Sequence, residues 1–171
     1  MSKWSEMGDF LSKLRVLDDF CDLFCMVDSF GGVTPDEVTN IYKIVKANTS
    51  VPVGFHGHNN LQFGLINSIT AMNLGVDYVD ATILGMGRGA GNCAMELLIG
   101  FLKNPKYNIY PVLDFIEKYM QPMKDSGTKW GYAEQYMLTG LLNQHPRTAI
   151  AYTGADRKDI TEYYKELTAQ E

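Results

Sequence analysis

Three short apolar runs divide the first half of the chain, and helical patterns separate them. The runs cover residues 22–27, 51–55 and 76–83, and each has the length of a buried strand. Apolar side chains recur at helical spacing in residues 34–47, 61–74 and 93–102. This alternation is typical of βαβ units, whose strands pair in parallel and whose ligands gather at the carboxyl ends of the strands.

Local signals mark the ends of these helices. Thr34, Pro35 and Glu37 supply an N-cap, a first-turn proline and the glutamate of a capping box. We expect Asn60 to cap the second helix and Asn92 to cap the third, because asparagine is a favoured N-cap residue. Gly75 is expected to end the second helix.

Beyond residue 105 the pattern is helical. It predicts helices over residues 112–120, 132–142 and 156–167, the last behind an aspartate cap, and a further helix over about 9–17 precedes the first strand. We therefore divide the chain into a partial barrel segment with the metal-site motifs, residues 1–105, and a helical region that packs on it, residues 106–171.

The predicted fold class is α/β, a partial TIM (β/α)8 barrel of about three βα units with C-terminal helices. A complete barrel takes roughly 250 residues, and the chain has 171. A three-stranded parallel sheet would leave two edges open, which parallel sheets rarely do. The pattern therefore predicts either a missing barrel half that covers the edges or self-association.

Composition excludes several classes of partner. The chain has 15 basic and 20 acidic side chains, a net charge of −5, and no cluster of Lys and Arg, so nucleic acid is not expected as a partner. No apolar run is long enough to span a membrane. The start lacks the apolar core of a signal peptide and three cysteines are too few for a disulfide framework, which predicts a cytoplasmic protein.

His56 and His58 are the sharpest chemical feature. They lie two residues apart at the end of the second strand, so both side chains point the same way and two imidazoles can reach one metal ion. Two histidines do not close a structural site, so oxygen donors would complete it and positions would stay open for substrate or water. The alternative is that both are ordinary strand-end histidines.

Polar residues at the ends of the other strands should share this edge. Ser29 could donate a hydrogen bond to a substrate carboxylate, although a simple turn at 28–32 explains the same residues. The glycine-rich loop at 85–91 lacks the ending of a nucleotide-binding loop and is followed by Asn92, whose oxygen could reach a metal. Asp80, in the third strand, reads as structural.

Four segments together resemble the second half of the 4-hydroxy-2-oxovalerate aldolases. They are VDSFGG at 27–32, GFHGHNN at 54–60, VDATILGMGRGAGN at 79–92 and GYAEQY at 131–136. These aldolases belong to the pyruvate metallolyase barrels, which include 3-hydroxy-3-methylglutaryl-coenzyme A lyase. The resemblance covers about residues 18–150.

The resemblance implies a divalent metal, Mn²⁺ or Mg²⁺, held by His56 and His58 together with an aspartate of the first barrel half. It further implies that Ser29 contacts the carboxylate of a 2-oxo acid substrate and that Asn92 lies at or beside the metal. A tyrosine of the C-terminal region would reach the site; Tyr132 is the candidate catalytic residue and Tyr136 the reserve.

The implied activity is cleavage of a 4-hydroxy-2-oxo acid to pyruvate and an aldehyde. Because the family's arginine and base histidine belong to the first half, we expect the chain to be incomplete and weakly active alone. An acylating aldehyde dehydrogenase is a partner of some such aldolases. Two alternatives stay open: a non-catalytic binding or assembly module, and an acyl-coenzyme A condensing synthase of the same superfamily.

Overall fold

Three parallel strands form the centre of the molecule. The computed structural model describes residues 13–169, in which strands β1 (Phe24–Asp28), β2 (Val53–Gly57) and β3 (Tyr78–Asp80) pair in the order β1-β2-β3. The register places Asp28 beside Gly57 and His56 beside Asp80. The predicted α/β class with about three βα units is confirmed, and all three strands end toward one edge.

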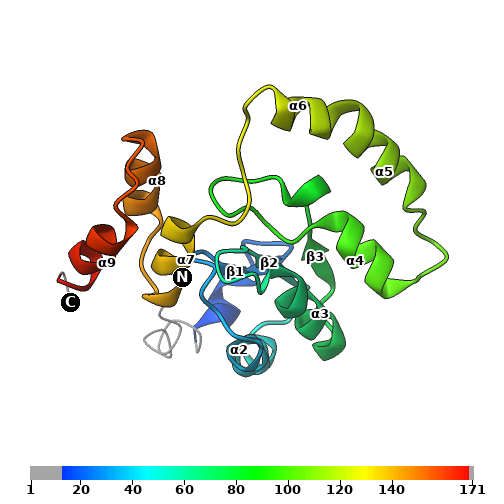
Figure 1. Ribbon diagram of the computed structural model, residues 1–171. Helices are drawn as coiled ribbons and strands as arrows, with labels where there is room; N and C mark the ends of the chain where they lie inside the picture. Colours follow the sequence, from blue (N-terminus) through cyan, green and yellow to red (C-terminus); the bar gives the residue numbers. More distant parts are fainter. Residues whose placement is uncertain (1–12, 170–171) are drawn as a thin grey trace.

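Helices α2 (Pro35–Asn48) and α3 (Gly64–Leu74) lie along one side of this sheet (Figure 1). The capping box is confirmed: Thr34 accepts from the Glu37 backbone, and the Glu37 carboxylate accepts from the Thr34 backbone at 2.8 Å. The core between strands and helices is built from fully buried side chains, among them Val38, Val45, Val53 and Phe55. Gly75 ends α3 in a left-handed conformation, as predicted.

The strand of the third βα unit is shorter than the apolar run at 76–83 predicts. Only Tyr78–Asp80 of the predicted strand 76–83 pairs with β2, and a 3-10 turn η3 (Ile83–Gly85) follows. The glycine-rich loop then leads to α4 (Met95–Leu102). Among the described residues β3 has no strand on its outer side.

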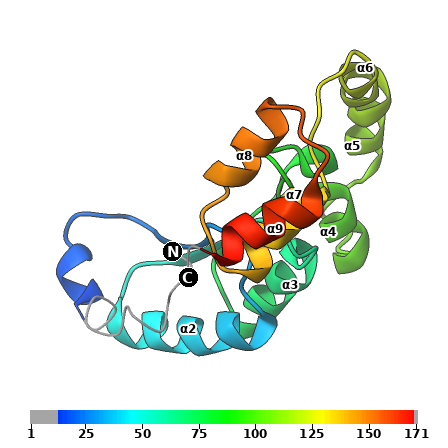
Figure 2. The same cartoon turned by 60° about the vertical axis from the view of Figure 1, so that its left-hand side comes forward.

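The remaining described residues are helical and form two groups. One continuous run consists of α5 (Tyr110–Phe115), a π-helical segment η4 (Ile116–Met120) and α6 (Gln121–Asp125). The second group is α7 (Glu134–Leu141), α8 (Arg147–Gly154) and α9 (Ile160–Thr168). The two groups lie apart in Figure 2. The predicted helix 112–120 is thus part of a longer run.

Several predicted boundaries are wrong. The last helix begins at Ile160 rather than at residue 156, Asp159 makes no side-chain cap bond there, and α8 was not predicted. A helix is also predicted over about residues 9–17, before β1. Residues 9–12 lie outside the described part, and of the rest Leu14–Leu17 forms a 3-10 turn, η2.

The predicted caps at Asn60 and Asn92 are also wrong. Helix α3 begins only at Gly64, whose N–H donates to the Asn59 side chain at 3.0 Å. Asn60 is buried and donates to the Tyr136 carbonyl at 3.0 Å. Helix α4 begins at Met95 without a side-chain cap bond, and Asn92 instead donates to the Met86 carbonyl at 3.0 Å. The side-chain amide of Asn60 is bound to a distant residue and that of Asn92 to its own loop, so neither caps a helix.

Between residues 13 and 169, no helix combines the length and the apolar character needed to cross a bilayer.

Replacing Phe55 tests whether the core between the strands and helices α2 and α3 stabilises the fold. Phe55 is fully buried, so we expect Phe55→Ala to lower the free energy of unfolding by about 3–5 kcal/mol, measured by urea denaturation. Phe101→Ala is the matched control, because the side chain of Phe101 on α4 is 57% exposed; it should change stability by about 0.5 kcal/mol or less. Equal effects of the two substitutions would contradict this core.

Candidate metal and substrate site

The carboxyl edge of the sheet brings the two histidines together as the sequence predicts. His56 is the penultimate residue of β2 and His58 follows the strand, and their ring centroids lie 4.8 Å apart at an interplanar angle of 82°. Strand alternation places both rings on the same side. Two imidazoles therefore face one region of space at the end of β2.

Each imidazole is oriented by an oxygen atom of a neighbouring strand. His56 Nδ1 lies 3.2 Å from the Asp80 carboxylate on β3, and His58 Nδ1 lies 2.6 Å from the Asp28 carbonyl at the end of β1. Because a carbonyl oxygen only accepts hydrogen bonds, Nδ1 of His58 carries the proton. Nδ1 of His56 faces the Asp80 carboxylate in the same way, so both Nε2 atoms are left for other partners. Metal-binding histidines are typically oriented in this way.

The environment of His58 favours the neutral ring. Burial lowers the pKa of His58 below its ordinary value, and the nearby charges of His56 and Arg88 lower it further, while the bond to the Asp28 carbonyl raises it. A neutral imidazole is the form that binds a metal ion. At neutral pH the His58 ring is therefore available as a ligand.

Asp28 shapes the turn beneath the histidines. Its fully buried carboxylate accepts from the backbone N–H groups of Gly32 at 3.1 Å and Val33 at 3.3 Å. Burial raises the pKa of Asp28 to about 6, and these N–H groups act in the opposite direction. The carboxylate is thus committed to the turn, and the backbone carbonyl of the same residue orients His58.

The glycine-rich loop is held from two sides. On one side it joins the end of β2, since His58 and Asn92 form an antiparallel bridge and the Asn59 N–H donates to the Gly91 carbonyl at 3.0 Å. On the other side Trp130 Nε1 donates to the Leu84 carbonyl at 2.8 Å and the Gly131 N–H donates to the Gly89 carbonyl at 3.0 Å. The loop is therefore a fixed wall beside the histidines.

Gly89 is the point where this loop meets α7. Its φ of +64° is in the left-handed region, and a Cβ atom there would lie 2.6 Å from Cε1 of the buried Tyr136 ring. Only glycine combines this backbone conformation with such a close approach. The loop and α7 are thus fitted to each other.

Of the other predicted site residues, Ser29 and Asn92 lie near His58 and the two tyrosines lie farther along the loop side. Ser29 follows directly after β1 and is half-buried at the same edge as His58. Asn92 pairs with His58 through the backbone, with its amide nitrogen bound to Met86. Tyr132 lies beyond the loop, 57% exposed, and within residues 13–169 it makes no hydrogen bond to either histidine. Tyr136 is buried under Gly89.

The residues fit one half of a metal site. Neither Nε2 atom has a hydrogen-bond partner in the described part of the chain. No group of three or more His, Cys, Asp or Glu that could hold a metal ion occurs in that same part. The two imidazoles are suitable ligands, and the remaining ligands would have to be oxygen atoms from other sources.

Asp80 is the member of this arrangement that the sequence analysis missed. It reads as structural in the sequence, yet its carboxylate orients His56 across the β2–β3 pair. The βα spacing was the available signal in the sequence: His56 and Asp80 lie near the ends of successive strands, and parallel pairing sets them side by side. Only the register of the strands makes this relation visible.

The family of this chain follows from its match to a family model. The model described as HMGL-like matches residues 15–118, which is more than half of the chain. The chain belongs to the HMGL-like family. The matched region of this family includes all three strands, both histidines and the glycine-rich loop.

Curated and structural relatives agree with this membership. A 4-hydroxy-2-oxovalerate aldolase from Carboxydothermus hydrogenoformans is 40% identical over 150 residues, which are 81% of this chain and 44% of that protein. The crystal structure of the N-terminal domain of a Bacteroides vulgatus protein assigned as an aldolase is 52% identical, with a TM-score of 0.81 over 90% of this chain and 52% of that one. The chain therefore spans about half the length of such relatives.

A more distant structure supports the fold alone. The HMG-CoA lyase of Bacillus subtilis is 18% identical and has a TM-score of 0.58, covering 64% of this chain and 40% of that one. The resemblance to the aldolases and the partial barrel are thus confirmed. The placement of the chain in the second half of an aldolase stays a prediction.

Two glycine substitutions test the fit between the loop and α7. Gly89→Ala should destabilise the protein by about 2 kcal/mol or more, because it combines a positive φ with a clash against Tyr136. Gly100→Ala, inside α4 with no atom within 4 Å of the new Cβ, should instead stabilise by about 0.5–1 kcal/mol. Thermal unfolding measures both. A neutral Gly89→Ala would show that the loop is not held against α7.

Proposed function

We propose that the chain is part of a divalent-metal-dependent carbon–carbon lyase that cleaves a 4-hydroxy-2-oxo acid to pyruvate and an aldehyde. The observation that carries this proposal is the pair of imidazoles at the carboxyl end of β2, each oriented through Nδ1 and each with Nε2 available. Membership of the HMGL-like family and the similarity to proteins named 4-hydroxy-2-oxovalerate aldolase support the reaction class.

In this proposal His56 and His58 hold Mn²⁺ or Mg²⁺, which when bound supplies Lewis-acid polarisation of the oxo-acid carbonyl. Ser29 donates a hydrogen bond to the substrate carboxylate from the end of β1. Asn92, fixed beside His58 by the backbone bridge, offers its side-chain oxygen at the same edge. Tyr132 is the proposed catalytic phenol, which approaches from the segment that follows Gly131.

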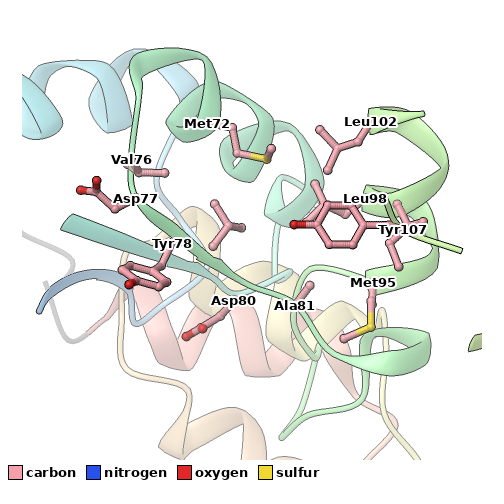
Figure 3. Close-up of a pocket in the computed structure, with 12 residues that line it drawn as sticks. Met72, Val76, Asp77, Tyr78, Asp80, Ala81, Met95, Leu98, Leu102 and Tyr107 are labelled. Carbon is pink, nitrogen blue, oxygen red and sulfur yellow. The ribbon is translucent and has the colours of Figure 1, made fainter. Parts of the chain in front are cut away.

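We further propose that additional barrel strands cover the outer edge of β3. A cavity of about 460 Å³ opens along this edge and is lined by apolar side chains such as Met72, Leu98 and Tyr107, with Asp80 at its rim (Figure 3). Relatives of about twice the length have residues for such strands. A strand in this position would end close to Asp80 and His56, where a further oxygen ligand is needed.

The isolated 171 residues should accordingly show little turnover. The described residues supply two imidazoles and no third ligand group, so electrostatic stabilisation of the developing enolate would be incomplete. A dehydrogenase that takes up the aldehyde stays a prediction of the resemblance.

Removing either imidazole tests the metal site. We expect His56→Ala and His58→Ala each to raise the dissociation constant for Mn²⁺ by about tenfold or more, because each change removes one direct ligand. Electron paramagnetic resonance of free Mn²⁺ in a titration measures binding without any need for turnover. The same variants of the longer protein should lose aldol cleavage of 4-hydroxy-2-oxovalerate.

His145→Ala is the matched control, because the third histidine packs edge-on against Phe30 and is not part of the pair. It should bind Mn²⁺ like the unchanged protein. Unaltered binding by His56→Ala and His58→Ala would refute the proposed metal site, and intact metal binding without aldol cleavage in the longer protein would refute the reaction.

A further inference from the structure

Another cavity lies across the glycine-rich loop from the histidines. Its volume is about 430 Å³, within the range of small-molecule sites, and the segment 128–133 forms much of its wall together with α7. Gly89 lines it from the loop, whereas Gly91 and Asn92 contact the end of β2. The loop thus separates this cavity from the candidate metal site.

The charge of this cavity differs from that of the whole chain. Its lining includes two ammonium groups, Lys124 and Lys129, and none of the described residues that line it is Asp or Glu. The chain as a whole carries a net charge of −5. The adjoining cavity is lined by Glu134 and Asp156 and shares Lys129 with the first, while Asp156 is paired with Lys158 at 2.6 Å. An anion in the first cavity would meet two cations.

Aromatic rings complete the cavity. The Trp130 indole is held by its hydrogen bond to the Leu84 carbonyl, so its ring is a fixed wall. The Lys124 ammonium lies 4.6 Å from the centre of this ring, and the exposed Tyr132 ring lies in the same lining. A fixed ring with a cation over it favours ligands that combine a flat apolar body with negative charge.

We propose that this cavity binds an aromatic carboxylate. The carboxylate lies between Lys124 and Lys129, and the flat body contacts Trp130 and Tyr132. The site uses none of the groups assigned to metal binding, although it shares Tyr132 with the lyase proposal. Binding of an aromatic carboxylate needs neither metal nor turnover, so the failure of one proposal can be told from the failure of the other. It gives the GYAEQY segment and the residues before it a function besides holding the loop.

Tryptophan fluorescence tests the proposal directly with benzoate as the probe. The chain has two tryptophans, so Trp4→Phe leaves Trp130 as the sole indole reporter. Benzoate should change the Trp130 emission saturably, because the anion draws Lys124 away from the ring. Benzyl alcohol has nearly the same shape without the charge, and it should bind about fivefold more weakly or worse.

Charge-removing variants complete the test. Lys124→Gln and Lys129→Gln should each weaken benzoate binding by about fivefold. Lys106→Gln is the matched control, since Lys106 also lies over an aromatic ring, 6.0 Å from the centre of Tyr107, but outside this cavity. Circular dichroism should show the same unfolding temperature for all three variants.

Three results would overturn the proposal. They are the absence of a saturable change with benzoate, equal binding of benzyl alcohol and benzoate, and equal affinities of Lys124→Gln, Lys129→Gln and Lys106→Gln. If Lys124→Gln lowers the unfolding temperature, the benzoate affinity of Lys129→Gln, whose side chain is exposed, is compared with that of Lys106→Gln instead.

Discussion

Parallel pairing of β1, β2 and β3 is the constraint on which the candidate site depends. Because all three strands run the same way, the residues that end them meet at one edge, and the register sets Asp28 level with Gly57 and Asp80 level with His56. Each imidazole then finds its orienting oxygen on a neighbouring strand rather than on its own. A slip of β2 by one residue would turn both rings to the opposite side of the sheet. The register of the strands therefore determines the orientation of the two histidine rings.

The C-terminal helices support this edge through the glycine-rich loop. Asn60, just beyond the histidines, donates to the Tyr136 carbonyl, and the Tyr136 ring lies under Gly89. The loop in turn bridges back to His58 through Asn92. These contacts join the end of β2, α7 and the loop in a ring, and the close approach of the Tyr136 side chain explains why residue 89 is glycine. The same ring of contacts places Trp130 as a wall of the lysine-lined cavity.

Features encoded by neighbouring residues could be predicted from the sequence, and features encoded across the fold could not. Thr34, Pro35 and Glu37 mark the start of α2 because a capping box is complete within four residues. The histidine pair follows from strand alternation alone. Asn60 has the same local appearance as a cap, but its partner lies 76 residues away in α7, and no local pattern contains that information. Asp80 likewise gains its role from the register, which pairs β3 with β2 and sets Asp80 beside His56.

The central claim is that His56 and His58 hold one metal ion through their Nε2 atoms. Anomalous diffraction from crystals grown with Mn²⁺, recorded on both sides of the manganese absorption edge, tests it most directly because it locates the ion without reference to activity. We predict one manganese peak within bonding distance of both Nε2 atoms, with Nδ1 of each ring still directed at Asp80 and at the Asp28 carbonyl. A Mn²⁺ ion bound elsewhere, with no peak between the two rings, would contradict it.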